Sequence, residues 1–149
     1  MENIFLQQAL LEAEKANRLG EVPVGAIIVK DGKIIARGHN NKELLNDCTA
    51  HAEVLAIKEA SQKLKNWRLN GCEMYVTLEP CPMCASVIAA ARIKTVYIGT
   101  FDPVIGACGS VVNLLQNDYL NYNIDVKWMY SEICSSIITK FFRRKRKTK

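Results

Sequence analysis

The alternation of strand-like and helix-like segments between residues 73 and 98 constrains the fold most strongly. Residues 73–78 and 94–98 are short apolar runs typical of strands, and residues 82–91 between them favour a buried helix that opens at Pro82. A strand–helix–strand unit closes through a right-handed crossover, which makes its two strands parallel. The sequence therefore predicts an α/β protein that contains a parallel strand pair.

The flanking segments add a hairpin and further helices. Residues 24–29 and 33–38 are rich in β-branched residues, and Asp31-Gly32 between them predicts a two-residue hairpin turn. The remaining predicted elements are helices over 2–19, 51–64, 110–116 and 131–145, and a last strand over 124–128. We expect a sheet that begins with an antiparallel hairpin and has helices packed on both faces.

Three of these helices carry more specific expectations. The first has an apolar stripe of Leu6, Ala9, Leu10, Ala13 and Ala16. Asp47 or Thr49 is a possible N-cap of the helix over 51–64. The expected buried stripe of the last helix is Ile133, Ile137, Ile138 and Phe141.

Length and composition fit one globular domain. The chain has 149 residues, of which 49% are hydrophobic, enough for a substantial core. No apolar run approaches the length of a membrane span, and the first residues lack the pattern of a secretory signal. We therefore expect a cytoplasmic protein whose six cysteines are reduced thiols or metal ligands rather than disulfides.

The net charge of +5 is unevenly distributed. Residues 140–149 hold seven Lys and Arg and no acid. Subtracting these seven charges from the net charge of +5 leaves −2 for residues 1–139. A cationic end of this kind is typical of contact with polyanions such as RNA, and it is also compatible with a solvated tail. We divide the chain into a domain over 1–142, which includes the C-terminal helix, and a basic tail over 143–149.

Two short motifs carry the chemistry: His51-Ala52-Glu53 and Pro80-Cys81-Pro82-Met83-Cys84. Cys81 and Cys84 are three residues apart at the start of a predicted helix, so they lie on one face and can bind the same ion. A helix N-terminus stabilises thiolates, the form that binds zinc. His51 supplies a third ligand from another helix start, which predicts one zinc ion per chain bound by His51, Cys81 and Cys84.

The number of ligands distinguishes a catalytic from a structural zinc site. Three protein ligands leave a position for water, whereas a structural site would need a fourth ligand, for which Cys48 and Cys72 are the candidates. Glu53 lies in the first turn of its predicted helix, where side chains lean towards the N-terminus. We expect Glu53 to act as the general acid and base that moves protons between water and the leaving ammonia.

The two motifs together follow the pattern H-x-E and P-C-x-x-C of zinc deaminases. The chain resembles the cytidine-deaminase-like superfamily and, within it, the bacterial tRNA-specific adenosine deaminases, over nearly its whole length. Further matching segments are Glu21–Ala26, Gly38–Asn40, Tyr75–Cys84, Asp102–Ser110 and Phe141–Arg144, whereas Val104 stands where the family often has a lysine. The resemblance implies a three-layer α/β/α sandwich with a mixed five-stranded sheet, and a homodimer.

The implied reaction converts the wobble adenosine of a tRNA anticodon, in an arginine tRNA, to inosine. In that reaction zinc-bound hydroxide attacks C6 of a flipped-out adenine, with Glu53 as the proton shuttle. The resemblance assigns substrate binding to Asn40, Val24, Ala52, Asp102, Phe142, Arg143 and Arg144. From the residues alone, Asn40 and Asp102 could equally serve turns, and Phe141 and Phe142 could serve core packing.

Two other functions are compatible with the same motifs. One is deamination of a free nucleobase or nucleotide, such as guanine or cytosine, by the same zinc centre. The other is a zinc-stabilised RNA-binding module without catalysis, which would require a closed, four-ligand site. The basic tail and the segment Asp102–Ser110 favour the RNA substrate.

Overall fold

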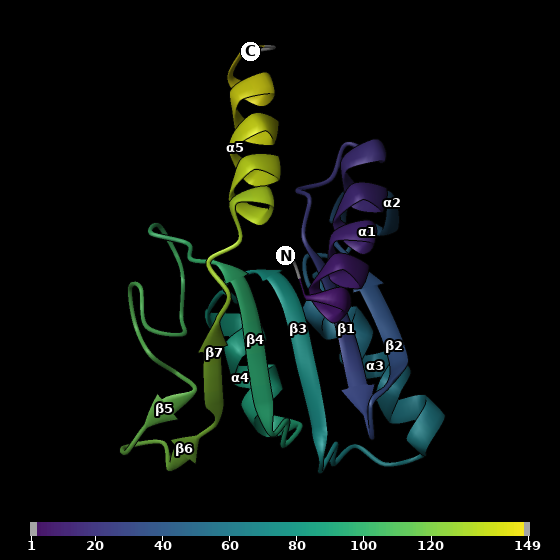
Figure 1. The fold of residues 1–149 in the computed structure, drawn as a ribbon, viewed down its shortest axis with the longest axis vertical. Helices are drawn as coiled ribbons and strands as arrows, with labels where there is room; N and C mark the ends of the chain where they lie inside the picture. The colour runs from purple at the N-terminus through teal and green to yellow at the C-terminus, as the bar shows by residue number, and fades with distance from the viewer. Residues whose placement is uncertain (1–2, 148–149) are drawn as a thin grey trace.

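The computed structural model describes residues 3–147, which form one five-stranded sheet with helices around it (Figure 1). The strands are β1 (Gly25–Lys30), β2 (Lys33–His39), β3 (Cys72–Leu78), β4 (Thr95–Thr100) and β7 (Asp125–Trp128). Their order across the sheet is β2-β1-β3-β4-β7. Strand β1 is antiparallel to both neighbours, whereas β3, β4 and β7 are parallel. This mixed sheet confirms the expected α/β class.

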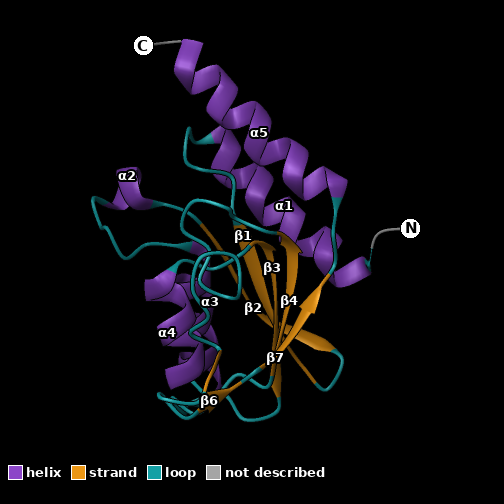
Figure 2. Cartoon of the chain, turned by 90° about the vertical axis from the view of Figure 1, so that its left-hand side faces the viewer, coloured by secondary structure: helices purple, strands orange, loops and turns teal. Residues whose placement is uncertain are grey.

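Helices cover both faces of the sheet and complete three layers (Figure 2). Helices α1 (Ile4–Arg18) and α5 (Glu132–Lys147) lie on one face, and α3 (Ala52–Leu64) and α4 (Pro82–Ala90) lie on the other. A short helix α2 (Lys42–Leu45) precedes α3, and β5 (Gln116–Asn117) pairs with β6 (Tyr122–Asn123) in a separate two-stranded ribbon. None of the described helices is long and apolar enough to cross a membrane.

The hairpin and the alternation of β1 follow from the sequence as expected. Asp31 and Gly32 both have positive φ, 51° and 76°, as the predicted tight turn requires. Along β1, Ala26 and Ile28 face α3 and α4, whereas Ile27 and Val29 face α1. The predicted stripe of α1 is buried throughout, which fixes this helix on the sheet. The strand is therefore buried on both faces.

Two expectations about the helices are wrong, one about the cap of α3 and one about a helix over 110–116. Asp47 does not cap α3; its carboxylate accepts hydrogen bonds from the backbone N–H and the hydroxyl of Thr49. No helix forms over 110–116, where Cys108 and Asn113 instead form an isolated bridge. Local polar contacts satisfy the backbone in both places, and they compete with helix formation.

The last helix packs differently from the expected stripe. Ile133 is 55% exposed, and Cys134 is fully buried in its place. Cys134 approaches β4 at Gly99, where an added Cβ would lie 2.5 Å from the Cys134 sulfur. Helix α5 continues to Lys147, so most of the basic segment 143–149 is helical, and Thr148 and Lys149 lie outside the described residues.

Candidate active site

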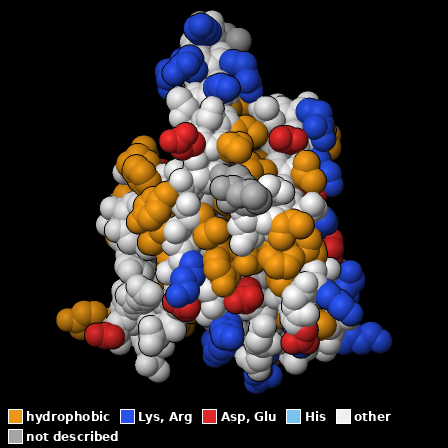
Figure 3. All heavy atoms as spheres, in the orientation of Figure 1, with side chains coloured by type: hydrophobic (Ala, Val, Ile, Leu, Met, Phe, Trp, Pro, Cys, Tyr) orange, Lys and Arg blue, Asp and Glu red, His pale blue; other side chains and the backbone are white. Residues whose placement is uncertain are grey.

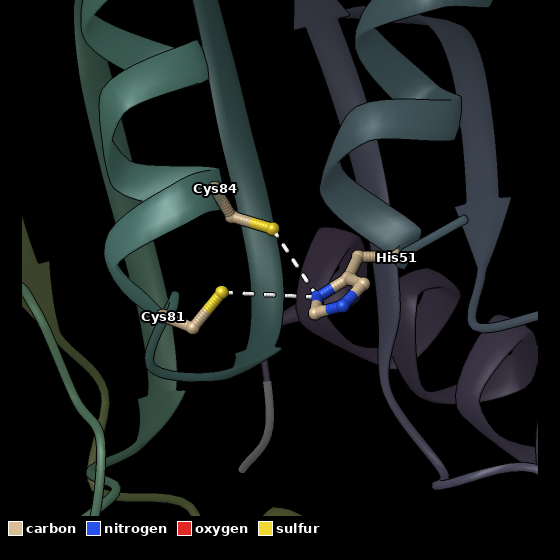
Figure 4. A group of neighbouring side chains, drawn as sticks. All are labelled: His51, Cys81 and Cys84. Carbon is tan, nitrogen blue, oxygen red and sulfur yellow. Dashed lines mark hydrogen bonds between the residues drawn. The ribbon is translucent and has the colours of Figure 1, made fainter. Parts of the chain in front are cut away.

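The three predicted metal ligands meet at the carboxyl end of the central strands (Figure 4). His51 immediately precedes α3, and Cys81 and Cys84 lie in the first turn of α4. The His51 Nδ1 atom is 3.4 Å from the Cys84 sulfur and 3.8 Å from the Cys81 sulfur. All three ligand atoms lie within 4.8 Å of one another. The two helix starts thus direct one imidazole and two thiols at a common point.

These distances suit a zinc ion. Zinc binds thiolate sulfur at about 2.3 Å and imidazole nitrogen at about 2.1 Å, so two such ligands at a tetrahedral angle lie roughly 3.6 Å apart. The two sulfur–nitrogen distances lie on either side of that value. Among residues 3–147, no other Cys, His, Asp or Glu joins this group. The described residues therefore supply three ligands, as a catalytic site does.

The protonation of the three groups also suits a cation. Contact with the Cys84 thiol lowers the pKa of Cys81 to about 4. Contact with Cys81 raises the pKa of His51, and the pKa of Cys84 is raised by the neighbouring Cys81 and by burial. Two adjacent thiols cannot both ionise without a compensating charge, and a divalent cation provides that charge.

The alternative ligands lie elsewhere. Cys48 is exposed and does not belong to the metal group. Cys72 is the first residue of β3, whereas Cys81 follows the other end of this strand. Cys72 therefore lies roughly 20 Å along the strand from the site. His39, the second histidine, hydrogen-bonds the backbone oxygen of Asn40 through Nδ1. Cys108 and Cys134 are buried free thiols outside the metal group.

Contacts with β2 determine where α3 begins. An added Cβ at Gly38 would lie 2.3 Å from the carbonyl oxygen of Ala52, so only glycine allows β2 to approach the helix this closely. The side-chain oxygen of Asn40 accepts a hydrogen bond from the Ala52 backbone N–H at 2.8 Å. Asn40 therefore supplies the capping contact that was expected from Asp47 or Thr49, and it places His51 beside the cysteines.

Glu53 lies beside the metal group. Its side chain is 3% exposed and lines the same pocket as His51 and Cys81. Burial raises the pKa of the Glu53 carboxyl to about 7, and contact with the Cys84 thiol acts in the opposite direction. The carboxyl thus neighbours the ligands without being one of them.

A pocket of about 310 Å³ opens over these residues. Of the residues that sequence reasoning assigned to the site, it is lined by Val24, Asn40, His51, Glu53, Cys81, Asp102 and Phe142. The other lining residues are Val22, Lys42, Leu78, Glu79, Phe101, Pro103, Val104, Ile105 and Ile138. The volume is at the lower end of the range for ligand pockets, which suits one nucleoside better than several.

Three expected substrate contacts lie outside this lining. Ala52 is fully buried, and its N–H is bonded to Asn40. Arg144 donates to the side-chain oxygen of Asn17 at 2.8 Å, which ties α5 to α1. Arg143 lines a separate surface depression along α5 together with Glu132 and Lys140. The two arginines therefore belong to the outer surface of α5 rather than to the pocket.

Sequence reasoning missed two buried carboxylates, Glu79, which lines the pocket, and Glu21, which binds the segment that begins with the lining residue Lys42. Glu21 is 3% exposed and accepts backbone hydrogen bonds from Lys42, Glu43 and Leu44 at 2.8–3.2 Å, which holds the start of α2. Glu79 is 2% exposed and binds the segment after β4. The only signal was the position of each acid beside apolar strand residues, where an unpaired carboxylate is costly.

Comparison with known proteins decides the family. The model of the cytidine and deoxycytidylate deaminase zinc-binding region matches residues 1–100. The chain belongs to this deaminase family. The match covers the metal group and Glu53, so the centre described above is the zinc-binding region of a deaminase.

Similar deaminases act on different substrates. The tRNA-specific adenosine deaminase of Bacillus subtilis is 44% identical over 149 residues, covering 99% of this chain and 92% of that one. A solved structure from studies of A-to-I editing by tRNA:A34 deaminases at the wobble position is 45% identical, with a TM-score of 0.80, and covers 83% of this chain and 95% of that one. The guanine deaminase of Bacillus subtilis is 32% identical, with a TM-score of 0.64 and 95% of both chains covered.

Proposed function

We propose that this deaminase converts adenosine to inosine at the wobble position of a tRNA anticodon, with an arginine tRNA as the substrate. The observation that carries the proposal is the zinc group His51, Cys81 and Cys84 beside Glu53, in a chain 44% identical to a tRNA-specific adenosine deaminase along almost its full length. The similarity to a tRNA:A34 deaminase structure supports the same substrate.

The chemistry divides between the metal and the protein. Zinc, when bound, makes water a nucleophile at neutral pH. Glu53 would take a proton from a water held at the His51, Cys81 and Cys84 group and deliver it to the amino group that leaves as ammonia, while the second proton of that water passes to N1 of the ring that becomes inosine. Its burial and its position in the pocket beside His51 support this role. The oxygen of Asn40 is bonded to Ala52, so its amide NH₂ is the part that can bind the nucleoside.

The surface around the pocket suits an RNA loop. Phe142 of α5 lines the pocket and is 42% exposed, so it can stack on an unpaired base next to the target. Beyond it, the last turns of α5 carry only basic residues, which form the blue cluster over the end of this helix in Figure 3. A single-stranded anticodon loop can present a flipped adenosine at low cost, with its phosphates near these cations.

The test is to compare substrates with the zinc-loaded protein. An anticodon stem-loop of arginine tRNA with adenosine at the wobble position is incubated with enzyme, digested to nucleosides and analysed for inosine by mass spectrometry. A stem-loop with guanosine at that position and the Glu53→Gln variant serve as controls. Inosine is expected only with the wild-type enzyme and the adenosine loop, and its absence there would refute the proposal.

A second candidate is deamination of a free base. The likeness to the guanine deaminase of Bacillus subtilis, which shares the fold over 95% of both chains, favours it. The same assay distinguishes the two candidates, because free guanine, cytosine and adenosine can be offered in parallel with the stem-loop. Turnover of a free base without inosine in the RNA would support the second candidate.

We also propose a homodimer that works in the cytoplasm. The segment between β4 and β7 leaves several large apolar side chains at least 46% exposed, namely Val104, Ile105, Val111, Val112 and Leu120. Exposed apolar side chains of this kind favour a protein interface. One chain has a mass of 16.7 kDa. Light scattering after gel filtration should give twice that mass. The cytoplasmic location rests on the tRNA substrate.

A further inference from the structure

Glu79 is a buried carboxylate that the chemistry above does not use. It follows the end of β3 and precedes Cys81 by two residues, and it is 2% exposed. No Lys, Arg or His among residues 3–147 forms an ion pair with it. Its charge is stabilised instead by hydrogen-bond donors of the protein.

Four donors converge on the Glu79 carboxylate, and all come from one segment. Oε1 accepts from the Asp102 backbone N–H at 2.9 Å and from the Ser110 hydroxyl. Oε2 accepts from the backbone N–H groups of Cys108 and Ser110 at 2.9 and 3.1 Å. The adjacent Pro80 oxygen accepts from Ala107 at 2.9 Å. The segment 102–110 is thus wrapped around this single side chain.

The same segment forms one wall of the pocket. Asp102, Pro103, Val104 and Ile105 all line it, and these four residues belong to no helix or strand. An added Cβ at Gly106 would lie 2.4 Å from the Glu79 carboxyl, so the chain must pass this close to the carboxylate. Within the wall, the Asp102 carboxylate accepts hydrogen bonds from the backbone N–H groups of Val104 and Ile105 at 3.0 and 3.3 Å, which form a local turn. Glu79 anchors this turn to β3 through the Asp102 N–H and through the residues 108–110 that follow it.

We propose that Glu79 is a positioning residue that fixes the 102–105 wall and thereby sets the affinity for the RNA substrate, but not the rate of the chemical step. The inference rests on the proposed tRNA substrate. A carboxylate suits this role because both of its oxygens accept hydrogen bonds. In glutamine, the NH₂ group would face two of the four donors whichever way the amide is turned, so the wall would have to move.

The experiment measures kcat and KM on the anticodon stem-loop for three variants. Glu79→Gln removes half of the acceptors, and Ser110→Ala removes only the hydroxyl donor. Glu12→Gln is the matched control, because Glu12 is also a buried carboxylate, 3% exposed, but is paired with Lys15 and Arg37 away from the pocket. Zinc content and thermal unfolding are recorded for each.

A positioning role predicts a split between KM and kcat. We expect Glu79→Gln to raise KM about tenfold or more, with kcat within about threefold of wild type and one zinc retained per chain. Ser110→Ala should raise KM by a smaller factor, about two- to threefold, and this variant carries the test if Glu79→Gln fails to fold. Glu12→Gln should leave both constants unchanged.

Three outcomes would overturn the inference. The first is an unchanged KM in both Glu79→Gln and Ser110→Ala. The second is a fall in kcat with KM unchanged. Loss of zinc in Glu79→Gln combined with an unchanged KM in Ser110→Ala would mean that Glu79 serves only the metal. In each of these cases wild-type inosine formation leaves the proposed function intact. A wild-type enzyme that forms no inosine in the RNA would refute the proposed function, and this inference with it.

Discussion

The side-chain oxygen of Asn40 accepts the backbone N–H of Ala52 at 2.8 Å, so the end of β2 holds the first turn of the helix that follows the metal-binding histidine. The contact satisfies an N–H group that the helix itself leaves unpaired. It also orients Asn40 in the pocket. The oxygen of this amide thus holds the helix, whereas its NH₂ group is available to the substrate. Substitutions can separate the two roles.

Asn40→Asp should separate the two roles. Aspartate keeps an oxygen for the Ala52 N–H and is an equally good capping residue, but it loses the NH₂ donor. We expect normal zinc content and thermal stability, with kcat/KM on the stem-loop reduced about tenfold or more. Asn40→Ala should in addition lower the unfolding temperature by about 2–4 °C, because it loses the cap. Full activity in Asn40→Asp would contradict the substrate contact.

Glu53→Gln should reduce turnover severely without loss of metal. The amide fills the same space beside His51 but cannot accept and return a proton. Since general acid–base catalysis contributes about 10²–10⁴-fold, we expect kcat to fall by at least about a hundredfold. Single-turnover inosine formation measures the rate, and metal analysis confirms one zinc per chain. A variant with kcat near that of wild type would exclude Glu53 as the proton shuttle.

His51→Ala and His39→Ala form a matched pair of histidine substitutions. His51 belongs to the metal group, whereas His39 only contacts the Asn40 oxygen. We expect His51→Ala to lose zinc and to unfold several degrees lower, because metal binding contributes to folding stability. His39→Ala should keep its metal. Removal of zinc from the wild type by a chelator should reproduce the first result reversibly, and equal zinc content in both variants would contradict the assignment.

The basic end of α5 should determine the salt dependence of RNA binding. Arg143 to Lys147 are all exposed, but Arg144 is hydrogen-bonded to Asn17 and Lys145 lies over the Phe141 ring. Replacing Arg143, Arg146 and Lys147 with glutamine should weaken stem-loop binding and reduce the slope of log K against log salt by about 0.7–0.9 for each lost phosphate contact. Arg144→Gln serves as the control with a packing role. An unchanged slope in the triple variant would show that these residues do not contact phosphate.

Sequence patterns correctly predicted the features of the fold that depend on residues close together in the chain. The apolar stripe of α1, the Asp31-Gly32 turn and the parallel pair around α4 each depend on neighbouring residues, and all three were correctly predicted. The zinc ligands were predicted because their spacing is chemically specific, and the group that they form is present. The roles assigned to Asn40 and Glu53 remain predictions.

The errors share a physical cause. The helix expected over 110–116 is absent because Asn113 Oδ1 accepts the backbone N–H groups of Leu115 and Gln116, and because the Ser110 N–H is bonded to Glu79, a distant acceptor that leaves no periodic signal. Helix α2 was not predicted because the carboxylate that holds its start is Glu21, about 20 residues earlier in the chain. Ile133 was misplaced because only the packed structure shows that Gly99 admits Cys134 instead.

The distribution of the three ligands over two helix starts has a consequence for the biogenesis of the protein. His51 precedes α3 and the cysteines open α4, and the two helices lie side by side on the sheet in which β1 pairs with β3. A newly made chain therefore offers zinc a lone cysteine pair, which is a weaker trap than the finished trio. The complete set of three ligands therefore exists only on the assembled sheet, so zinc binding stabilises the folded chain over the unfolded one.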